Sequence, residues 1–207
     1  MPLVVNLLAK HRTILVLCVL SAFCISLITL SYLRSSNFTY FFLGWILFFA
    51  WVPLFFALIW QHRLKFGKLV KWKRAAMFCL WLLFFPNAPY LITDLVHLNT
   101  RFNPAIWADT LLLFSCATAG LVLGIYSLHI VHQIILRSFK PWKAWMVVGS
   151  SLVLTGYGIY LGRVQRWNSW DLFTNPVSLL TDTVMQLGNP QALKMTVGFS
   201  SLLFIIY

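Results

Sequence analysis

Long apolar runs separated by short polar connections dominate the hydrophobic pattern of this 207-residue chain. A membrane-spanning helix needs about 20 apolar residues, because each residue advances it by about 1.5 Å through a hydrocarbon core about 30 Å thick. We therefore expect an all-α polytopic membrane bundle of about six transmembrane helices in a single domain covering residues 1–207. The six runs cover residues 13–33, 38–60, 75–92, 106–136, 144–162 and 190–207.

Two prolines interrupt the third apolar run. Pro86 and Pro89 lack the backbone N–H and clash with the preceding turn, so this helix must bend or stop there. Carbonyl groups freed inside a membrane need partners, and Asn87 is placed to supply one. Two readings stay open: a discontinuous helix that lines a site, as in transporters, and a kink that only shapes the bundle.

Smaller patterns refine this bundle. Residues 176–188 predict a short interfacial helix, with apolar positions at helical spacing and Gly188 as its stop. Asn189 is expected to cap the sixth helix, with Pro190 at its first position. Glycines at GxxxG spacing predict close helix approach in the fourth and fifth helices; the pairs are Gly120 with Gly124 and Gly158 with Gly162.

Composition supports a chain that uses lipid as its solvent. Hydrophobic residues make up 60% of the chain and charged residues only 10%, whereas a soluble domain carries about 25% charged residues. The first apolar run is too long for a signal-peptide core, so we interpret it as a retained helix. The four cysteines form no CxxC pair, and we interpret them as small buried hydrophobic residues.

Basic residues are concentrated in three connections. The chain has 16 Lys and Arg against four acids, and eleven of the sixteen lie in residues 10–12, 61–74 and 137–143. If six helices alternate across the membrane, these connections share one side, and the positive-inside rule makes that side cytoplasmic. Both termini are then cytoplasmic. Orientation in the membrane explains the net charge of +12, and no nucleic-acid partner is expected.

The acids and the densest polar stretches fall on the opposite, outer face. We expect a polar cluster there, formed by Asn87, Asp94, His97, Arg101, Asp109, Arg163, Arg166, Asn168 and Asp171. Its aspartates and arginines would either pair with one another, as charges inside bundles do, or bind a lipid headgroup or another anionic ligand. Tryptophans in the same segment would anchor at headgroup level. No metal ligand set and no cofactor is expected.

Two motifs resemble a known family. The segments FFPNAPYLITDLVHL, residues 84–98, and YLGRVQRWNSWDL, residues 160–172, resemble the domain of unknown function 1361 family of small bacterial integral membrane proteins. The resemblance covers most of the chain from the second helix onward. It implies a bacterial location, which we take as the cytoplasmic (inner) membrane. It implies no activity, substrate or cofactor.

Two functional classes remain. In the first, the protein is a non-catalytic component, either a transporter-like binding protein or a partner subunit. In the second, it is an outer-face enzyme acting on a lipid or lipid-linked phosphate, with Asp94 and His97 in acid–base roles and Arg163 and Arg166 as phosphate clamp. The chain has no HExxH, GxSxG or Walker motif, which favours the first class. None of these patterns specifies an oligomeric state.

Overall fold

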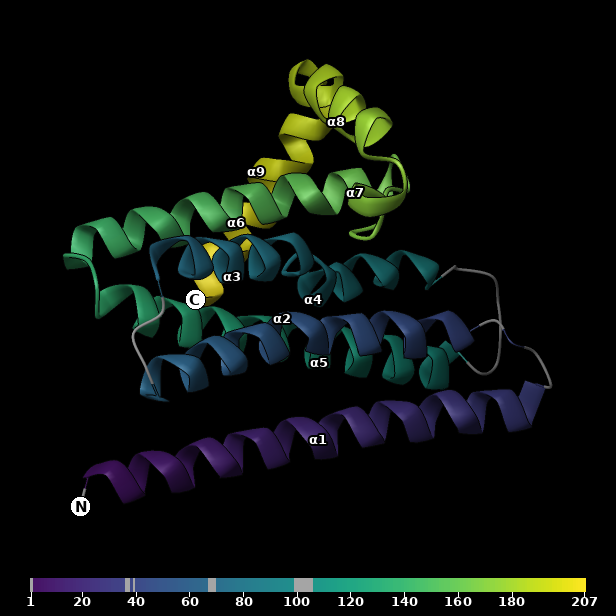
Figure 1. The fold of residues 1–207 in the computed structure, drawn as a ribbon. Helices are drawn as coiled ribbons and strands as arrows, with labels where there is room; N and C mark the ends of the chain where they lie inside the picture. Colours follow the sequence, from purple (N-terminus) through teal and green to yellow (C-terminus); the bar gives the residue numbers. More distant parts are fainter. Residues whose placement is uncertain (1, 36–37, 39, 67–69, 99–105) are drawn as a thin grey trace. The chain divides into compact units, whose positions relative to one another are not determined.

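The computed structural model describes residues 2–35, 38, 40–66, 70–98 and 106–207, without the side chains at 2–10, 35, 65, 66 and 97. Over these ranges the chain is helical and has no strand, which confirms the all-α fold (Figure 1). The longer helices are α1 (Pro2–Ser35), α2 (Phe41–Phe66), α3 (Lys71–Phe84), α5 (Ile106–Leu136), α6 (Pro141–Arg163) and α9 (Pro190–Ile206). The shorter ones are α4 (Asn87–Tyr90), η1 (Leu91–His97), α7 (Asp171–Thr174), α8 (Pro176–Met185) and η2 (Gln186–Gly188).

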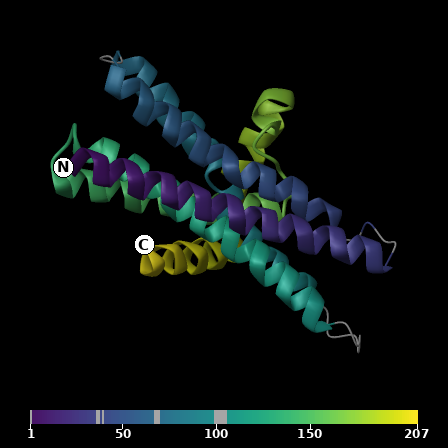
Figure 2. The ribbon, with the colours of Figure 1, turned by 90° about the horizontal axis from the view of Figure 1, so that it is seen from below.

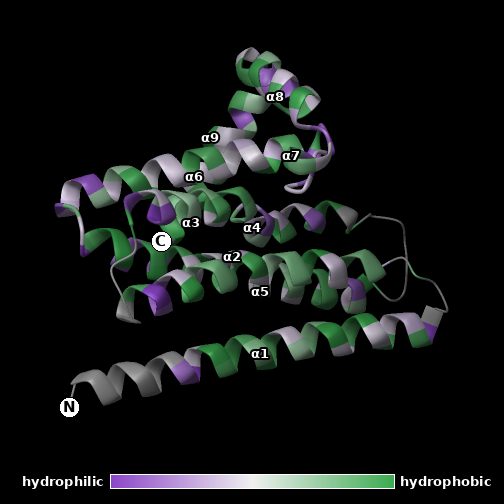
Figure 3. Ribbon diagram, in the orientation of Figure 1, coloured by the Kyte–Doolittle hydropathy of each residue, from purple (hydrophilic) through white to green (hydrophobic). Residues whose placement is uncertain are grey.

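Within the residues that the structure describes, five segments are long and apolar enough to cross a membrane. Hydrophobic residues cover most of the long helices, while hydrophilic residues gather near helix ends and in connections (Figure 3). The helix α9 has 17 residues, about 25 Å at 1.5 Å per residue, which is short for a hydrocarbon core. The sixth crossing therefore stays a prediction. The five spans are His11–Arg34, Phe41–Leu64, Lys71–Val96, Ile106–Leu136 and Pro141–Arg163.

The third helix is broken, as its prolines predict. The helix α3 ends at Phe84, and a turn at Phe85 and Pro86 leads into the single-turn α4. After Pro89 the backbone tightens into the 3₁₀ helix η1. Each proline removes one backbone donor, so the α-helical hydrogen-bond ladder cannot continue through this segment. The result is a helical span whose two halves have different backbone geometry.

The chain divides into two compact units, which we describe separately. Unit 1 comprises residues 1–51 and 88–123, and unit 2 comprises residues 52–87 and 124–207. In unit 1, the indole Nε1 of Trp51 on α2 donates to Ser21 Oγ on α1 at 3.0 Å. Gly120 on α5 lies so close to Ala88 and Leu91 that a Cβ there would overlap them. The single-domain expectation stays a prediction.

Close helix approaches hold unit 2 together. The indole Nε1 of Trp81, on α3, donates to Ser127 Oγ on α5 at 2.7 Å. The helix α9, the yellow ribbon in Figure 2, packs against α6, and Gly156 provides the room for Thr196 and Ser200. At Gly158 a Cβ would lie 2.9 Å from Pro86 Cγ, so α6 approaches the break in the third helix closely.

Candidate functional site

Ser169 links the loop after α6 to the broken helix in unit 2. Its hydroxyl donates to the carbonyl oxygen of Leu83 at 3.0 Å and accepts from Asn87 Nδ2 at 2.9 Å. The last carbonyls of a helix have no partner within it, and Ser169 satisfies one of those of α3. The sequence suggested that Asn87 would bond such a carbonyl. Instead Ser169 does so, and Asn87 holds Ser169 in place.

A second network surrounds the hydroxyl of Tyr160, whose side chain is fully buried. This hydroxyl donates to Gln186 Oε1 at 2.8 Å and accepts from Gln165 Nε2 and from Asn189 Nδ2, each at 3.2 Å. Asn189 Nδ2 also donates to Gln186 Oε1 at 2.7 Å. The sequence pattern does not reveal this network, because Gln186 lies 26 positions from Tyr160 and no local motif joins them.

Asn189 also caps α9, as predicted. Its side-chain oxygen accepts from the backbone N–H of Gln191 at 2.9 Å, and Pro190 occupies the first turn. The side-chain oxygen of Asn189 therefore caps α9, and its side-chain nitrogen bonds the start of α9 to Tyr160.

The predicted short helix at residues 176–188 is present as α8 and η2, and its polar side faces the rest of unit 2. Trp167 Nε1 donates to Asp182 Oδ2 at 3.0 Å, and the Tyr157 hydroxyl donates to the carbonyl oxygen of Thr183 at 2.5 Å. The apolar side points outward: the exposed fractions of Val177, Leu180 and Val184 are 75%, 57% and 66%. The outward side of this helix therefore carries Val177, Leu180 and Val184, while Asp182 and Thr183 are half-buried against the rest of unit 2.

The predicted charged residues of the loop after α6 take separate roles. Asp171 accepts from the backbone N–H of Asn168 at 2.7 Å and from the Thr174 hydroxyl at 3.2 Å, which tightens the turn into α7. Arg163 lies half-buried in the last turn of α6, where its charge complements the helix dipole. Arg166 is exposed and has a left-handed backbone, with φ of 61°.

Asp94 and Asp109 belong to unit 1. Asp94, on η1, is buried with 1% of its surface exposed. Asp109, in the first turn of α5, accepts a hydrogen bond from Tyr40. Tyr40 is the residue just before the span that starts at Phe41. Burial, and then the nearby Asp109 carboxylate, raise the pKa of Tyr40 to about 12. Tyr40 was not among the expected site residues.

The cysteines match their expected role in part. All four are free thiols, and Cys24 and Cys116 are fully buried and in contact with each other in unit 1. Cys18 and Cys79 lie exposed on helix surfaces, which corrects the expectation that all four are buried. An apolar run does not reveal which of its sides faces the bundle, and these two thiols fall on the outward side.

The expected nine-residue cluster is distributed over the two units. Asp94 and Asp109 lie in unit 1, and Asn87, Arg163, Arg166, Asn168 and Asp171 lie in unit 2. The His97 side chain and the whole of Arg101 are outside the described residues. Convergence of all nine residues stays a prediction. No group of three His, Cys, Asp or Glu side chains able to hold a metal ion occurs in the part of the chain that the structure describes.

Comparison with known proteins gives one match. A family model described as "Protein of unknown function (DUF1361)" matches residues 45–206, a range that contains both motifs at residues 84–98 and 160–172. No curated protein and no solved structure matches the chain. The family description names no activity.

Proposed function

Because the chain belongs to the DUF1361 family of proteins of unknown function, as its two motifs predicted, we propose a role from the geometry of unit 2. The protein is a non-catalytic component of the bacterial cytoplasmic membrane, and residues 164–189 form a fixed binding platform on its outer face. We call residues 164–189 the outer platform. Hydrogen bonds from Tyr157 and Tyr160 on α6 fix it in place, and the bond from Trp167 to Asp182 braces it internally.

The orientation of α8 carries this proposal. A helix on the surface of a protein in water buries its apolar side and exposes its polar side. The outward position of three large apolar side chains in α8 supports contact of Val177, Leu180 and Val184 with the acyl boundary of the outer leaflet. Burying such a side chain fully contributes about 1.5–3 kcal/mol relative to water, so three of them favour the membrane strongly.

The same geometry weighs against the enzyme alternative. A general acid or base must come within about 2.6–3.2 Å of the group whose proton it moves. Asp94, the proposed acid–base residue, is 1% exposed. The amide and hydroxyl groups around Tyr160 bond one another, which suits a structural network better than a substrate pocket.

Topology within unit 2 supports the outer assignment of the platform. The start of α3 and the connection between α5 and α6 line one cavity, and both segments are basic. The outer platform follows the other end of α6, after Arg163. With the basic end in the cytoplasm, by the positive-inside rule, the platform lies outside and both termini lie inside.

Fluorescent labelling of α8 tests this function. In a chain with Cys18 and Cys79 replaced by serine, Leu180→Cys carries an environment-sensitive fluorophore, and Ser178→Cys, on the opposite side of α8 at about 200° around the helix axis, is the matched control. In lipid vesicles we expect blue-shifted emission at position 180 and quenching by brominated lipid several-fold stronger than at position 178. Equal, weak quenching at both positions would contradict a membrane-seated platform.

A further inference from the structure

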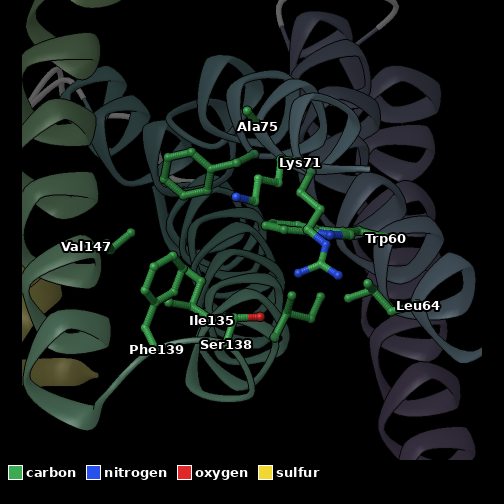
Figure 4. A pocket seen from close by; sticks show the side chains of 11 residues that line it. Trp60, Leu64, Lys71, Ala75, Ile135, Ser138, Phe139 and Val147 are labelled. Carbon is green, nitrogen blue, oxygen red and sulfur yellow. The ribbon is translucent and has the colours of Figure 1, made fainter. Parts of the chain in front are cut away.

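A cavity of about 610 Å³ lies at the basic end of unit 2 (Figure 4). Its walls come from α2, α3, α5, α6 and the connection between α5 and α6. Sites for small molecules enclose about 300–1,000 Å³, so this cavity is large enough for part of an organic ligand. No role considered above uses it.

The lining separates apolar walls from a few polar groups. Trp60, Phe78 and Phe139 contribute large apolar surfaces, and the polar groups are Lys71, Arg74 and the Ser138 hydroxyl. The Lys71 amine and the Ser138 hydroxyl both point toward the middle of the space (Figure 4). None of the described lining residues is acidic. A ligand that suits this lining has an anionic group attached to an apolar chain.

Lys71 and Arg74 are placed to share one anion. They lie three residues apart in the first turn of α3, a spacing that puts side chains on the same helix face. An ammonium and a guanidinium together suit a phosphate group, which accepts several charge-assisted hydrogen bonds.

Aromatic residues beside the cavity indicate its depth in the membrane. Trp72 and Trp142 are exposed, and each has a lysine amine over its ring, Lys73 at 5.5 Å and Lys143 at 5.4 Å. Exposed tryptophans with neighbouring lysines are typical of the headgroup level of a bilayer. The ligand that meets a cavity at this depth is a membrane lipid.

We propose that this cavity binds an anionic phospholipid, with one acyl chain between Trp60, Phe78 and Phe139 and the phosphate on Lys71 and Arg74. Basic pockets between membrane helices bind anionic headgroups in this way. The apolar walls favour a lipid over free phosphate, and the paired cations favour an anionic over a zwitterionic lipid. The inference does not depend on the outer platform, which follows the opposite end of α6.

Competition between two lipids tests the proposal. The full chain is purified in detergent and equilibrated with phosphatidylglycerol and phosphatidylcholine, and bound lipid is counted by native mass spectrometry. The variant Lys71→Gln/Arg74→Gln should lose affinity for phosphatidylglycerol about 30-fold, because each cation near a membrane surface contributes about fivefold. The matched control Lys73→Gln/Lys143→Gln removes the same charge outside the cavity and should change the affinity less than threefold. An equal loss in both variants overturns the proposal.

Two further experiments distinguish binding of the whole lipid from binding of its phosphate alone. They also show whether each variant folds. Ala75→Trp fills the cavity with the charges intact and should also lose bound phosphatidylglycerol, with thermal unfolding in detergent as the check that each variant folds. Retention of the lipid by folded Ala75→Trp overturns the proposal, even if the double variant fails to fold. Inorganic phosphate added alone should leave the bound lipid in place, and its displacement by phosphate overturns the role of the acyl chain.

Discussion

Arg166 has a backbone conformation that is unfavourable for a residue with a Cβ. Its φ of 61° lies in the left-handed region, which costs a residue with a Cβ about 1–2 kcal/mol and costs glycine little. The chain reverses at this point, because the next residue, Trp167, donates its N–H back to the carbonyl of Leu161 at 3.1 Å. Glycine would serve this turn better, so the presence of arginine favours a role for its exposed side chain.

Substitution of Arg166 separates backbone strain from the side chain. Arg166→Gly and Arg166→Ala remove the same charge, but only glycine relieves the left-handed strain. We expect the free energy of unfolding of the glycine variant to exceed that of the alanine variant by about 0.5–1 kcal/mol. Relief of the left-handed strain stabilises the glycine variant, and the greater entropy of its unfolded chain offsets part of that gain. Thermal or denaturant unfolding in detergent measures the difference. Equal stabilities would mean that the turn does not need this conformation.

The sequence predicted several members of the polar cluster but not their hydrogen-bond partners. Asn87, Asp171 and Asn168 each make polar contacts in unit 2. Ser169 and Tyr160 were overlooked, because a serine inside an aromatic motif and a tyrosine inside an apolar run carry no local signal. Their roles arise from partners 86 and 26 positions away, which only the packed helices bring close.

The broken third helix depends on the neighbour that packs against its break. Pro86 predicts the interruption from the sequence, whereas the packing of Gly158 against it, on α6, emerges only from the fold. The bounds of α5 equal the predicted run because that run is uninterrupted. The helices α1 and α6 extend beyond their predicted runs at both ends, and α2 and α3 do so at one end, since an apolar pattern marks only the part that lies in lipid.

A pair of glycine substitutions in α6 tests that approach. In Gly158→Ala the added Cβ would lie 2.9 Å from Pro86 Cγ, whereas in Gly149→Ala nothing lies within 4 Å. Overpacking typically costs about 1–3 kcal/mol, so we expect Gly158→Ala to lower the free energy of unfolding by that amount. The control should be neutral or more stable, by up to about 1 kcal/mol, because alanine favours helix. Similar stabilities of both variants would contradict a close contact at Pro86.

The topology of the whole molecule rests on charge and helix count together. Composition and run length sufficed to predict a multi-pass membrane protein, because both are properties of the whole chain. Run length supports the sixth crossing less well than the other five, since the 17 residues of α9 fall short of a full span. The apolar pattern does not reveal the division into two units, because the unit boundaries cut α2 and α5 within continuous apolar runs.

Reporter fusions test the topology. An enzyme reporter that is active only outside the cytoplasm, fused after Gly67 or after Asn175, should be inactive at the first site and active at the second. This result follows from the basic residues at 61–74 and from an odd number of crossings between the two sites. Activity at both sites, or at neither, would contradict the orientation and with it the outer position of the platform.

The packing of α9 on α6 has a consequence for synthesis. Ser200 donates to the carbonyl of Leu152 at 3.1 Å, and Thr196 fits against Gly156. A helix of 17 residues that carries such hydroxyls gains little from lipid alone. Translation proceeds from the N-terminus, so α6 reaches the translocon before α9. We therefore expect α6 to serve as the docking template on which α9 enters the bilayer, and integration of α9 to depend on its partner.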